Sequence, residues 1–199
     1  MILSNVEVQR ALKSGRLIIK PEPLPRRPGF GEHCPYDTHT VDLTLGTELV
    51  IPEGGPFTID FAQPGKIAEF IGKNSAKRSI SKDNPYTLEI GKFILGQTLE
   101  TVGLPIKPDS KTCLAARIEG KSSRARCGLL IHFTAPTVHP GWHGPLTLEM
   151  INLGPAAITL KPGIAIAQLI VEEVRGAPFA NESQFHGQST PEGTKAKRR

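Results

Sequence analysis

The chain has 199 residues, of which 38% are hydrophobic and 6% aromatic, and it carries a formal net charge of +5 at pH 7. This length allows one domain with a substantial core. The sequence contains no run of about 20 apolar residues that would span a membrane. Its 3 cysteines form no CxxC pair, which argues against a disulfide framework. We therefore expect a cytoplasmic protein without membrane or nucleic-acid partners, since the basic excess is small and partly terminal, although its sign suits polyanionic ligands such as triphosphates.

The N-terminal segment predicts a short helix. Ser4-Asn-Val-Glu7 is a capping-box pattern, in which Ser4 caps the helix and Glu7 reaches back to it. The helix should run from about Asn5 to Ser14 and stop at Gly15. A loop rich in proline and glycine follows from Lys20 to about Pro35.

The middle of the chain predicts short strands joined by turns. The 20 glycines and 18 prolines disfavour long helices, and residues 40–45 alternate as a half-buried strand does. Many short strands at nearly even spacing indicate a barrel or a jelly-roll-like sandwich. From Gly176 the composition becomes polar, so we expect a β-domain over residues 1–175 and a flexible tail over 176–199, able to act as a lid. Further strands are expected at Glu48–Ile51, Tyr86–Ile90, Phe93–Thr101, Thr112–Glu119, Leu129–Thr134, Leu146–Asn152, Ala156–Leu160 and Gly163–Val174.

Glu149 lies within one of these strands, in the stretch GPLTLEMINLG from Gly144 to Gly154. Leu146, Leu148 and Met150 share one face of the strand, so Glu149 lies on the other face together with Thr147 and Ile151. A solvent-facing carboxylate is the simpler interpretation, because one wet face is common in antiparallel sheets. The alternative is a carboxylate held in a semi-enclosed site to transfer protons.

A second candidate feature is the turn from Ile118 to Gly128. It contains hydroxyls, cations and a glycine, the groups that bind anions, between two apolar flanks that would hold the turn rigidly. It lacks the GxxxxGK[ST] spacing of a Walker A loop, and a basic surface turn remains the alternative. The polar residues of this turn are Lys121, Ser122, Ser123, Arg124 and Arg126.

The histidines do not indicate a zinc site. His139 and His143 are four residues apart, but Pro140-Gly141 between them predicts a turn, so the spacing does not place both on one helix face. The HxE and PCxxC motifs of zinc-dependent deaminases are also missing. Trp142, in the same turn, would serve either as core filler or as a platform for a base or a sugar.

The order of these motifs resembles the dCTP deaminase family within the dUTPase-like superfamily. The resemblance rests on GKSSRARCGL from Gly120 to Leu129, on the TA and PGW motifs between Thr134 and Gly144, on Leu148-Glu149 and on Lys161-Pro-Gly163. Residues 40–46 and 93–100 and the N-terminal helix also match. The match is weakest over Lys20–Pro35 and Gly54–Asn84.

The resemblance implies a mainly β fold, a distorted jelly-roll β-barrel with a short N-terminal helix, which forms homotrimers with active sites between subunits. It implies hydrolytic deamination of dCTP to dUTP and ammonia without zinc, with Mg²⁺ bound through the triphosphate of the nucleotide. Glu149 would be the proton shuttle, Ser122 and the Ala135 carbonyl would hold the attacking water, and Arg126 would orient the carboxylate and keep it ionised. The implied substrate-binding residues are Lys121, Ser123, Arg124, Ala125, His139, Trp142, Thr147, Leu148, Gln184 and Gln188.

Two positions depart from the family pattern. His139 stands where the family usually has an aspartate, so we do not expect a combined deaminase and diphosphatase. Gln184 stands where relatives usually have a lysine, so one charged phosphate contact is missing. A dUTP diphosphatase on the same fold and a non-catalytic nucleotide-binding regulatory trimer are the alternatives.

Overall fold

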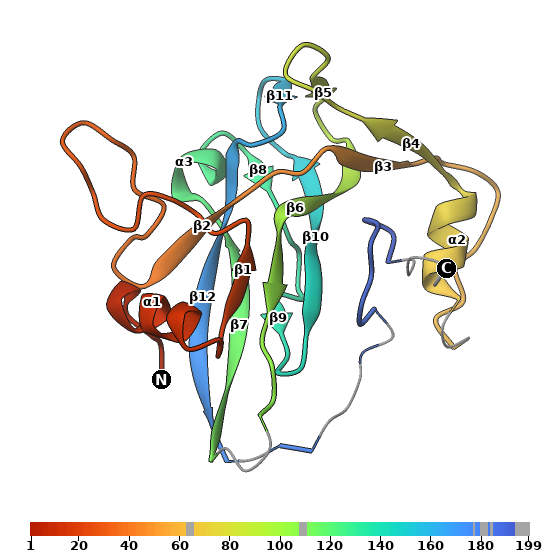
Figure 1. Ribbon diagram of the computed structural model, residues 1–199. Helices are drawn as coiled ribbons and strands as arrows, with labels where there is room; N and C mark the ends of the chain where they lie inside the picture. Colours follow the sequence, from red (N-terminus) through yellow and green to blue (C-terminus); the bar gives the residue numbers. More distant parts are fainter. Residues whose placement is uncertain (63–65, 108–110, 177, 180–182, 184, 194–199) are drawn as a thin grey trace.

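The computed structural model describes residues 1–62, 66–107, 111–176, 178–179, 183 and 185–193. Within these residues the chain is mainly β, with two larger sheets, a two-stranded ribbon and three short helices. Figure 1 shows the two sheets side by side, with the N-terminal helix on one side of the molecule and the C-terminal segment on the other. The mainly β fold with a short N-terminal helix is confirmed, whereas the strands that are described do not close into a continuous barrel.

The N-terminal helix α1 (Asn5–Lys13) begins and ends close to where the sequence predicts. The Ser4 side chain accepts a hydrogen bond from the Glu7 backbone N–H at 3.4 Å, which is the expected cap. The chain leaves the helix through Gly15, whose φ of 68° is accessible to glycine at no steric cost. The Glu7 side chain does not reach back as the capping-box pattern predicts, because it forms an ion pair with Arg10 one turn later.

The larger sheet carries the strand that holds Glu149. Its order is β4 (Ser75–Ser79), β3 (Glu48–Pro52), β6 (Phe93–Gly103), β10 (His143–Asn152) and β8 (Leu129–Leu130), and β1 (Ile18–Lys20) also pairs with β6. All these pairings are antiparallel. In the ladder between β6 and β10, Glu149 lies opposite Leu95, and a bulge occurs between Pro145 and Thr147. Pairing with β6 along nearly its whole length, and with β8 at its last two residues, fixes the backbone of β10.

The second sheet has the order β2 (Thr40–Thr44), β12 (Ala165–Arg175), β7 (Thr112–Gly120) and β9 (Thr137–Val138). The ribbon pairs β5 (Tyr86–Leu88) with β11 (Ile158–Leu160). The short helix α3 (Ser122–Ala125) connects β7 of this sheet to β8 of the larger sheet. The polar turn predicted from the sequence therefore crosses from one sheet to the other.

The structure corrects several predicted boundaries. The strand expected over residues 129–134 ends at Leu130, because β8 pairs only with the last two residues of β10. The last strand begins at Ala165 rather than Gly163, whose φ of 80° belongs to a turn. The turn after Lys121 contains one helical turn, α3. The elements that the sequence did not predict are β1, β9, α3, the helix α2 (Ile67–Lys73) and β4.

Both sheets contribute to one hydrophobic core, so replacing a core residue is expected to destabilise the whole domain. The Leu169 side chain of β12 is 0% exposed and belongs to this core. We expect Leu169→Ala to lower the free energy of unfolding by about 2–5 kcal/mol, through lost burial and the cavity left behind. Leu153→Ala, at a side chain that is 61% exposed in the single chain, is the matched control and should change stability by less than about 0.5 kcal/mol. Urea denaturation at fixed protein concentration measures both, and equal effects would contradict this description of the core.

Candidate active site

A cavity of about 990 Å³ lies next to β10 and contains Glu149 in its wall. One wall is formed by β10 and the turn that follows β9, and another by the C-terminal segment. A third wall is apolar and includes Phe57, Phe70 and Ile71 from the region around α2. The predicted site residues that line this cavity are Ala135, His139, Trp142, Thr147, Glu149 and Gln188.

The position of Glu149 follows from the alternation of β10. Leu146, Leu148 and Met150 are at most 5% exposed and point into the core. Thr147 and Glu149 therefore point to the opposite face, where they are only partly buried. Glu149 is thus not a freely solvated surface residue, because this face of β10 is a wall of the cavity. The position of this glutamate is therefore semi-enclosed, and its part in proton transfer stays a prediction.

Burial raises the pKa of Glu149 above the ordinary value of a glutamate. Three interactions oppose that shift: hydrogen bonding from the backbone at Glu149 itself, the charge of His132 and hydrogen bonding from the Phe133 backbone. A carboxyl group whose pKa is raised by burial is a candidate for general acid–base catalysis, which needs a group that both accepts and donates a proton.

His132 and Glu119 form a pair that was not predicted from the sequence, and neither residue lines the cavity. The His132 Nε2 atom lies 3.2 Å from the Glu119 Oε2 atom, and the histidine side chain is 17% exposed. Its Nδ1 atom is buried without a hydrogen-bond partner among the described residues. The available signal was the position of His132 directly after the buried Leu129–Ile131 segment, three residues before Ala135.

Trp142 and His139 lie in the turn between β9 and β10. The Trp142 ring packs against the hydrophobic core and also lines the cavity, so it serves as core filler and as cavity wall at once. Its indole Nε1 donates a hydrogen bond to the Gly144 carbonyl at 3.2 Å, which fixes the ring. Its other neighbour is His186 of the C-terminal segment, at 6.4 Å between ring centroids in an edge-on arrangement. His139 is exposed and lines the cavity.

The serine–arginine motif forms the helix α3, and its side chains are exposed. Ser122, Ser123, Arg124, Ala125 and Arg126 are all exposed in the single chain. None of them lines the cavity that contains Glu149. Exposed hydroxyl and guanidinium groups on a short, fixed helix are available to a ligand or to a second polypeptide.

Gly128 fixes the end of this motif against the larger sheet. Its φ is 88°, and a Cβ atom at this position would come within 2.1 Å of the Gly154 backbone nitrogen. The Gly128 carbonyl accepts a hydrogen bond from the Leu153 N–H at 2.8 Å. Only glycine fits this close approach of two backbone segments, so α3 is held in place relative to the end of β10.

Lys121 precedes α3 and is engaged within its own chain. Its ammonium group forms an ion pair with Asp42 of β2, and its side chain is 17% exposed. The lysine expected to face phosphates is therefore directed toward β2 in the unliganded chain.

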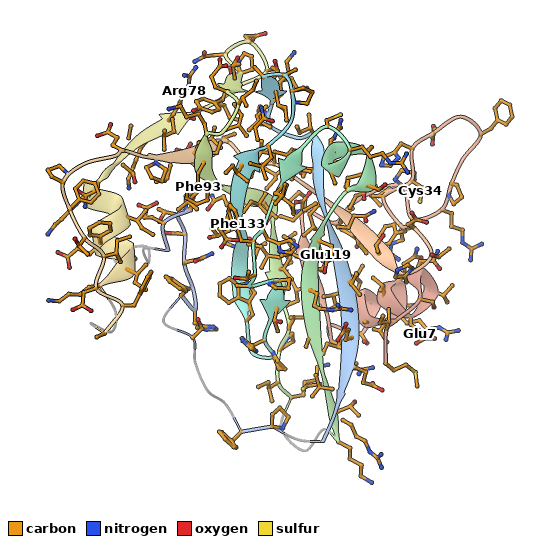
Figure 2. The ribbon with its side chains drawn as sticks, turned by 180° about the vertical axis from the view of Figure 1, so that it is seen from behind. Glu7, Cys34, Arg78, Phe93, Glu119 and Phe133 are labelled. Carbon is orange, nitrogen blue, oxygen red and sulfur yellow. The ribbon has the colours of Figure 1, made fainter. Side chains whose placement is uncertain are left out.

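The two halves of the predicted site lie on different sides of one chain. In Figure 1, α3 lies on the side of the 21–35 loop, whereas the C-terminal segment and α2 lie on the opposite side. Figure 2, seen from behind, gives the same separation: Phe93 and Phe133 lie on the side of the C-terminal segment, and Cys34 lies on the side of α3. Among the described residues no ion pair joins Arg126 to Glu149. Within one chain, Arg126 therefore does not orient Glu149.

The C-terminal segment lies against the cavity. The Gln188 side chain, which is 6% exposed, donates hydrogen bonds from Nε2 to the Pro145 carbonyl at 3.2 Å and to the Thr147 Oγ1 at 2.9 Å. Thr147 in turn donates a hydrogen bond to the Pro191 carbonyl at 3.1 Å. Glu192, 2% exposed, pairs with Lys77 of β4. Gln188 thus contacts β10 directly, and Gln184 lies outside the described residues.

Several contributors to the cavity were not predicted from the sequence. The apolar wall around α2 comes from the part of the chain that shows the weakest family resemblance. The neighbouring strand β4 has a polar sequence, so it shows no strand pattern. The Lys77–Glu192 pair joins residues far apart in the sequence, so no local pattern could have indicated it.

The remaining features concern metal ligands, cysteines and membrane-spanning helices. No group of three or more His, Cys, Asp or Glu side chains that could hold a metal ion occurs among the described residues. The three cysteines are free thiols. No helix in the described part of the chain is long and apolar enough to cross a membrane.

Known proteins resemble this chain in both sequence and fold. A protein named dCTP deaminase from Rhodospirillum rubrum is 34% identical over 174 residues, which cover 86% of this chain and 82% of the relative. A protein named "dCTP deaminase, dUMP-forming" from Rhodococcus opacus is 40% identical over 204 residues, covering 98% and 96% of the two chains.

The fold is shared with the crystal structure of 2'-deoxycytidine 5'-triphosphate deaminase from Agrobacterium tumefaciens, with a TM-score of 0.60, 17% identity and 85% of this chain covered. This chain spans 46% of that structure's chain, so the likeness concerns one part of it. A family model described as dCTP deaminase-like matches residues 2–174. Since this match covers most of the 199 residues, the chain belongs to the dCTP deaminase-like family.

Proposed function

We propose that this chain catalyses the hydrolytic deamination of dCTP to dUTP and ammonia, with Glu149 as the proton shuttle and no zinc. The observation that supports this most directly is the half-buried Glu149 carboxyl in a cavity wall, with a pKa raised by burial. A carboxyl group in such a position can accept a proton in one step and donate it in the next. The names of the relatives agree with this substrate and reaction.

The chemistry needs three proton movements at the cytosine ring. Water attacks C4 while it loses a proton, ring N3 gains a proton, and the departing amine gains another. Glu149 takes the proton from water, passes it to N3, and later transfers the second hydroxyl proton to the amine, so that ammonia leaves and the C4 carbonyl forms. General acid–base catalysis of this type contributes typically about 10²–10⁴-fold, and positioning of the water has to provide much of the remainder.

In this proposal, the attacking water is held by groups from two copies of the chain. Ala135 lines the same cavity as Glu149, and its carbonyl would accept a hydrogen bond from the attacking water. The Ser122 hydroxyl and the Arg126 guanidinium would come from α3 of a second copy, because α3 is exposed and remote from the cavity of its own chain. Arg126 would then lower the pKa of Glu149 relative to that in the single chain, and would orient its carboxylate. The active assembly in this proposal is a homotrimer with one site at each interface.

The remaining predicted residues receive substrate-binding roles. Thr147 and Leu148 would frame the base by backbone contacts, because the Leu148 side chain itself is 0% exposed. His139 would contact the deoxyribose hydroxyl and Trp142 would support the nucleoside from the cavity wall. Mg²⁺ would enter as part of the nucleotide complex. The groups assigned to the triphosphate are Lys121, Ser123, Arg124 and the backbone at Ala125.

We also propose that residues 176–199 form a lid over the β-domain of residues 1–175. The support is the packing of Gln188 and Pro191 against Thr147, and of His186 against Trp142, at the edge of the cavity. Gln188 would exchange its contacts with β10 for contacts with the phosphates when nucleotide binds. A lid of this kind excludes water other than the attacking molecule.

The direct test is ammonia and pyrophosphate release by the wild-type chain supplied with dCTP and Mg²⁺. We expect ammonia in equal amount to dUTP and no pyrophosphate, because His139 replaces the aspartate that would activate water for phosphate cleavage. Pyrophosphate release together with dUMP would contradict this specificity and would match the name of the Rhodococcus relative.

The two alternatives give different results in the same assay. A dUTP diphosphatase would release pyrophosphate from dUTP and no ammonia from dCTP. A non-catalytic regulatory trimer would show a dCTP-dependent rise in melting temperature without any product.

A further inference from the structure

Asp42 is a buried carboxylate on β2 with a different partner on each oxygen. It is 5% exposed. The Lys121 ammonium group contacts its Oδ1 atom, and the His33 Nε2 atom lies 2.9 Å from its Oδ2 atom. A buried carboxylate is costly unless it keeps a cation or strong hydrogen-bond donors, so the two partners matter together.

The Asp42–Lys121 ion pair crosses β12 and joins β2 to the residue that precedes α3. The strands β2 and β7 do not pair with each other, because both pair with β12, where Asp42 lies opposite Gln168 and Gly120 opposite Ala167. Lys121 follows β7 and begins α3, since its carbonyl accepts the N–H groups of Arg124 and Ala125 at 2.9 Å each. Asp42 therefore acts on α3 through Lys121, as a positioning residue.

His33 belongs to the 21–35 loop, which the family resemblance does not explain. The loop is fixed to β2 at its end, because the Asp42 N–H donates to the Pro35 carbonyl at 2.8 Å. The His33 side chain is 69% exposed and is therefore accessible to solvent. Its ring contacts Asp42, and Asp42 contacts Lys121. Three other titratable groups of the loop have contacts of their own: Cys34 with Pro25 and Tyr36, Glu22 with Arg26 and Tyr36, and Glu32 against Gly29. The remaining charged group of the loop, Arg27, is exposed.

We propose that His33 is a proton-linked replacement cation for Lys121. When a nucleoside triphosphate draws the Lys121 ammonium group toward its phosphates, the buried Asp42 carboxylate loses its cation. His33 then takes up one proton from solvent, and the imidazolium becomes the charged partner of Asp42. Binding of the polyanion at Lys121 is thereby coupled to proton uptake on the loop, which gives the 21–35 loop a function in substrate binding.

The coupling makes nucleotide affinity depend on pH in one direction. Histidine changes its charge between about pH 5 and 8. If binding takes up a proton at His33, the affinity falls as the pH rises through that range. The dissociation constant can rise by at most about tenfold per pH unit for one linked proton. Since His33 touches neither the base nor the water, kcat should not carry this dependence.

The test is calorimetric and rests on the proposed nucleotide site. The Glu149→Gln variant is titrated with Mg²⁺–dCTP at pH 7 in two buffers of different ionisation enthalpy, so that the substrate is not consumed and Glu149 cannot contribute protons. We expect net uptake of between zero and one proton. In the Glu149→Gln/His33→Gln double variant the uptake should fall close to zero, because glutamine preserves a neutral hydrogen-bond donor but cannot be protonated.

His39→Gln in the same background is the matched control, since His39 is exposed and contacts Thr38 rather than Asp42. It should leave proton uptake unchanged. Binding with equal proton uptake in the presence and absence of His33 overturns this inference alone. Absence of any dCTP binding overturns the proposed function, and the inference with it.

Discussion

Glu149→Gln is expected to lower kcat for ammonia release from dCTP by about 10²–10⁴-fold, the range typical of a lost general acid–base group. The amide has nearly the same shape as the carboxyl group, so the fold and the cavity should remain as they are. It cannot take a proton from water or hand one to ring N3. Because Glu149 lies in the cavity wall and not in the core, the loss should appear in kcat with little change in the free energy of unfolding.

The pH dependence of the wild-type rate gives a second readout of the same residue. Burial raises the pKa of Glu149, and the reaction begins with the ionised form taking a proton from water. The rate should therefore fall on the acidic side as Glu149 becomes protonated, at a pH that Arg126 of the second copy lowers relative to that of the single chain. This acidic limb should be missing from any residual activity of Glu149→Gln, since glutamine does not titrate.

Glu48→Gln is the matched control for charge removal, because Glu48 is an exposed glutamate at the start of β3. Its activity should equal that of the wild type. A Glu149→Gln enzyme that releases ammonia at the wild-type rate would remove Glu149 from the mechanism. A variant that loses activity together with its folded structure would be recognised by denaturation, and Glu149→Asp, which keeps the acid but moves it, then tests the same role.

The parts of the fold that could be predicted are those with a local physical cause. The alternation of residues 146–151 places three apolar side chains in the core, and it places Glu149 on the opposite face without reference to any other strand. The Ser4 cap and the Gly15 stop likewise depend on neighbouring residues only. Such signals indicate where an element lies and which face is buried, and they were sufficient for most of the strands and for α1.

The parts that could not be predicted depend on contacts between distant segments. Residues 75–79, Ser-Ala-Lys-Arg-Ser, contain no apolar alternation, yet they form β4 because β3 offers a free edge. The partner of Lys121 is Asp42, which lies 79 positions earlier in the chain. The His132–Glu119 pair depends on how the chain returns from α3. Sequence reading therefore found the chemical groups of the candidate site, but not the wall around α2 or the partners that hold these groups in place.

Mixing two inactive variants is expected to restore activity if the site is shared between copies. Arg126→Gln should lower kcat by about 10²–10³-fold, the loss typical of removing one preorganised electrostatic group. In a cyclic oligomer, a complete site needs Glu149 from one subunit and Arg126 from the next. Homo-oligomers of Glu149→Gln and Arg126→Gln, unfolded together in equal amounts and refolded, should therefore regain about one quarter of the wild-type sites, since only one neighbour combination in four supplies both residues.

Each variant refolded alone gives the baseline. The exposed α3, remote from the cavity of its own chain, leads to this expectation. If Glu149 and Arg126 served the same site from one chain, no mixed oligomer would hold an intact pair, and activity would stay at the baseline however the subunits were combined.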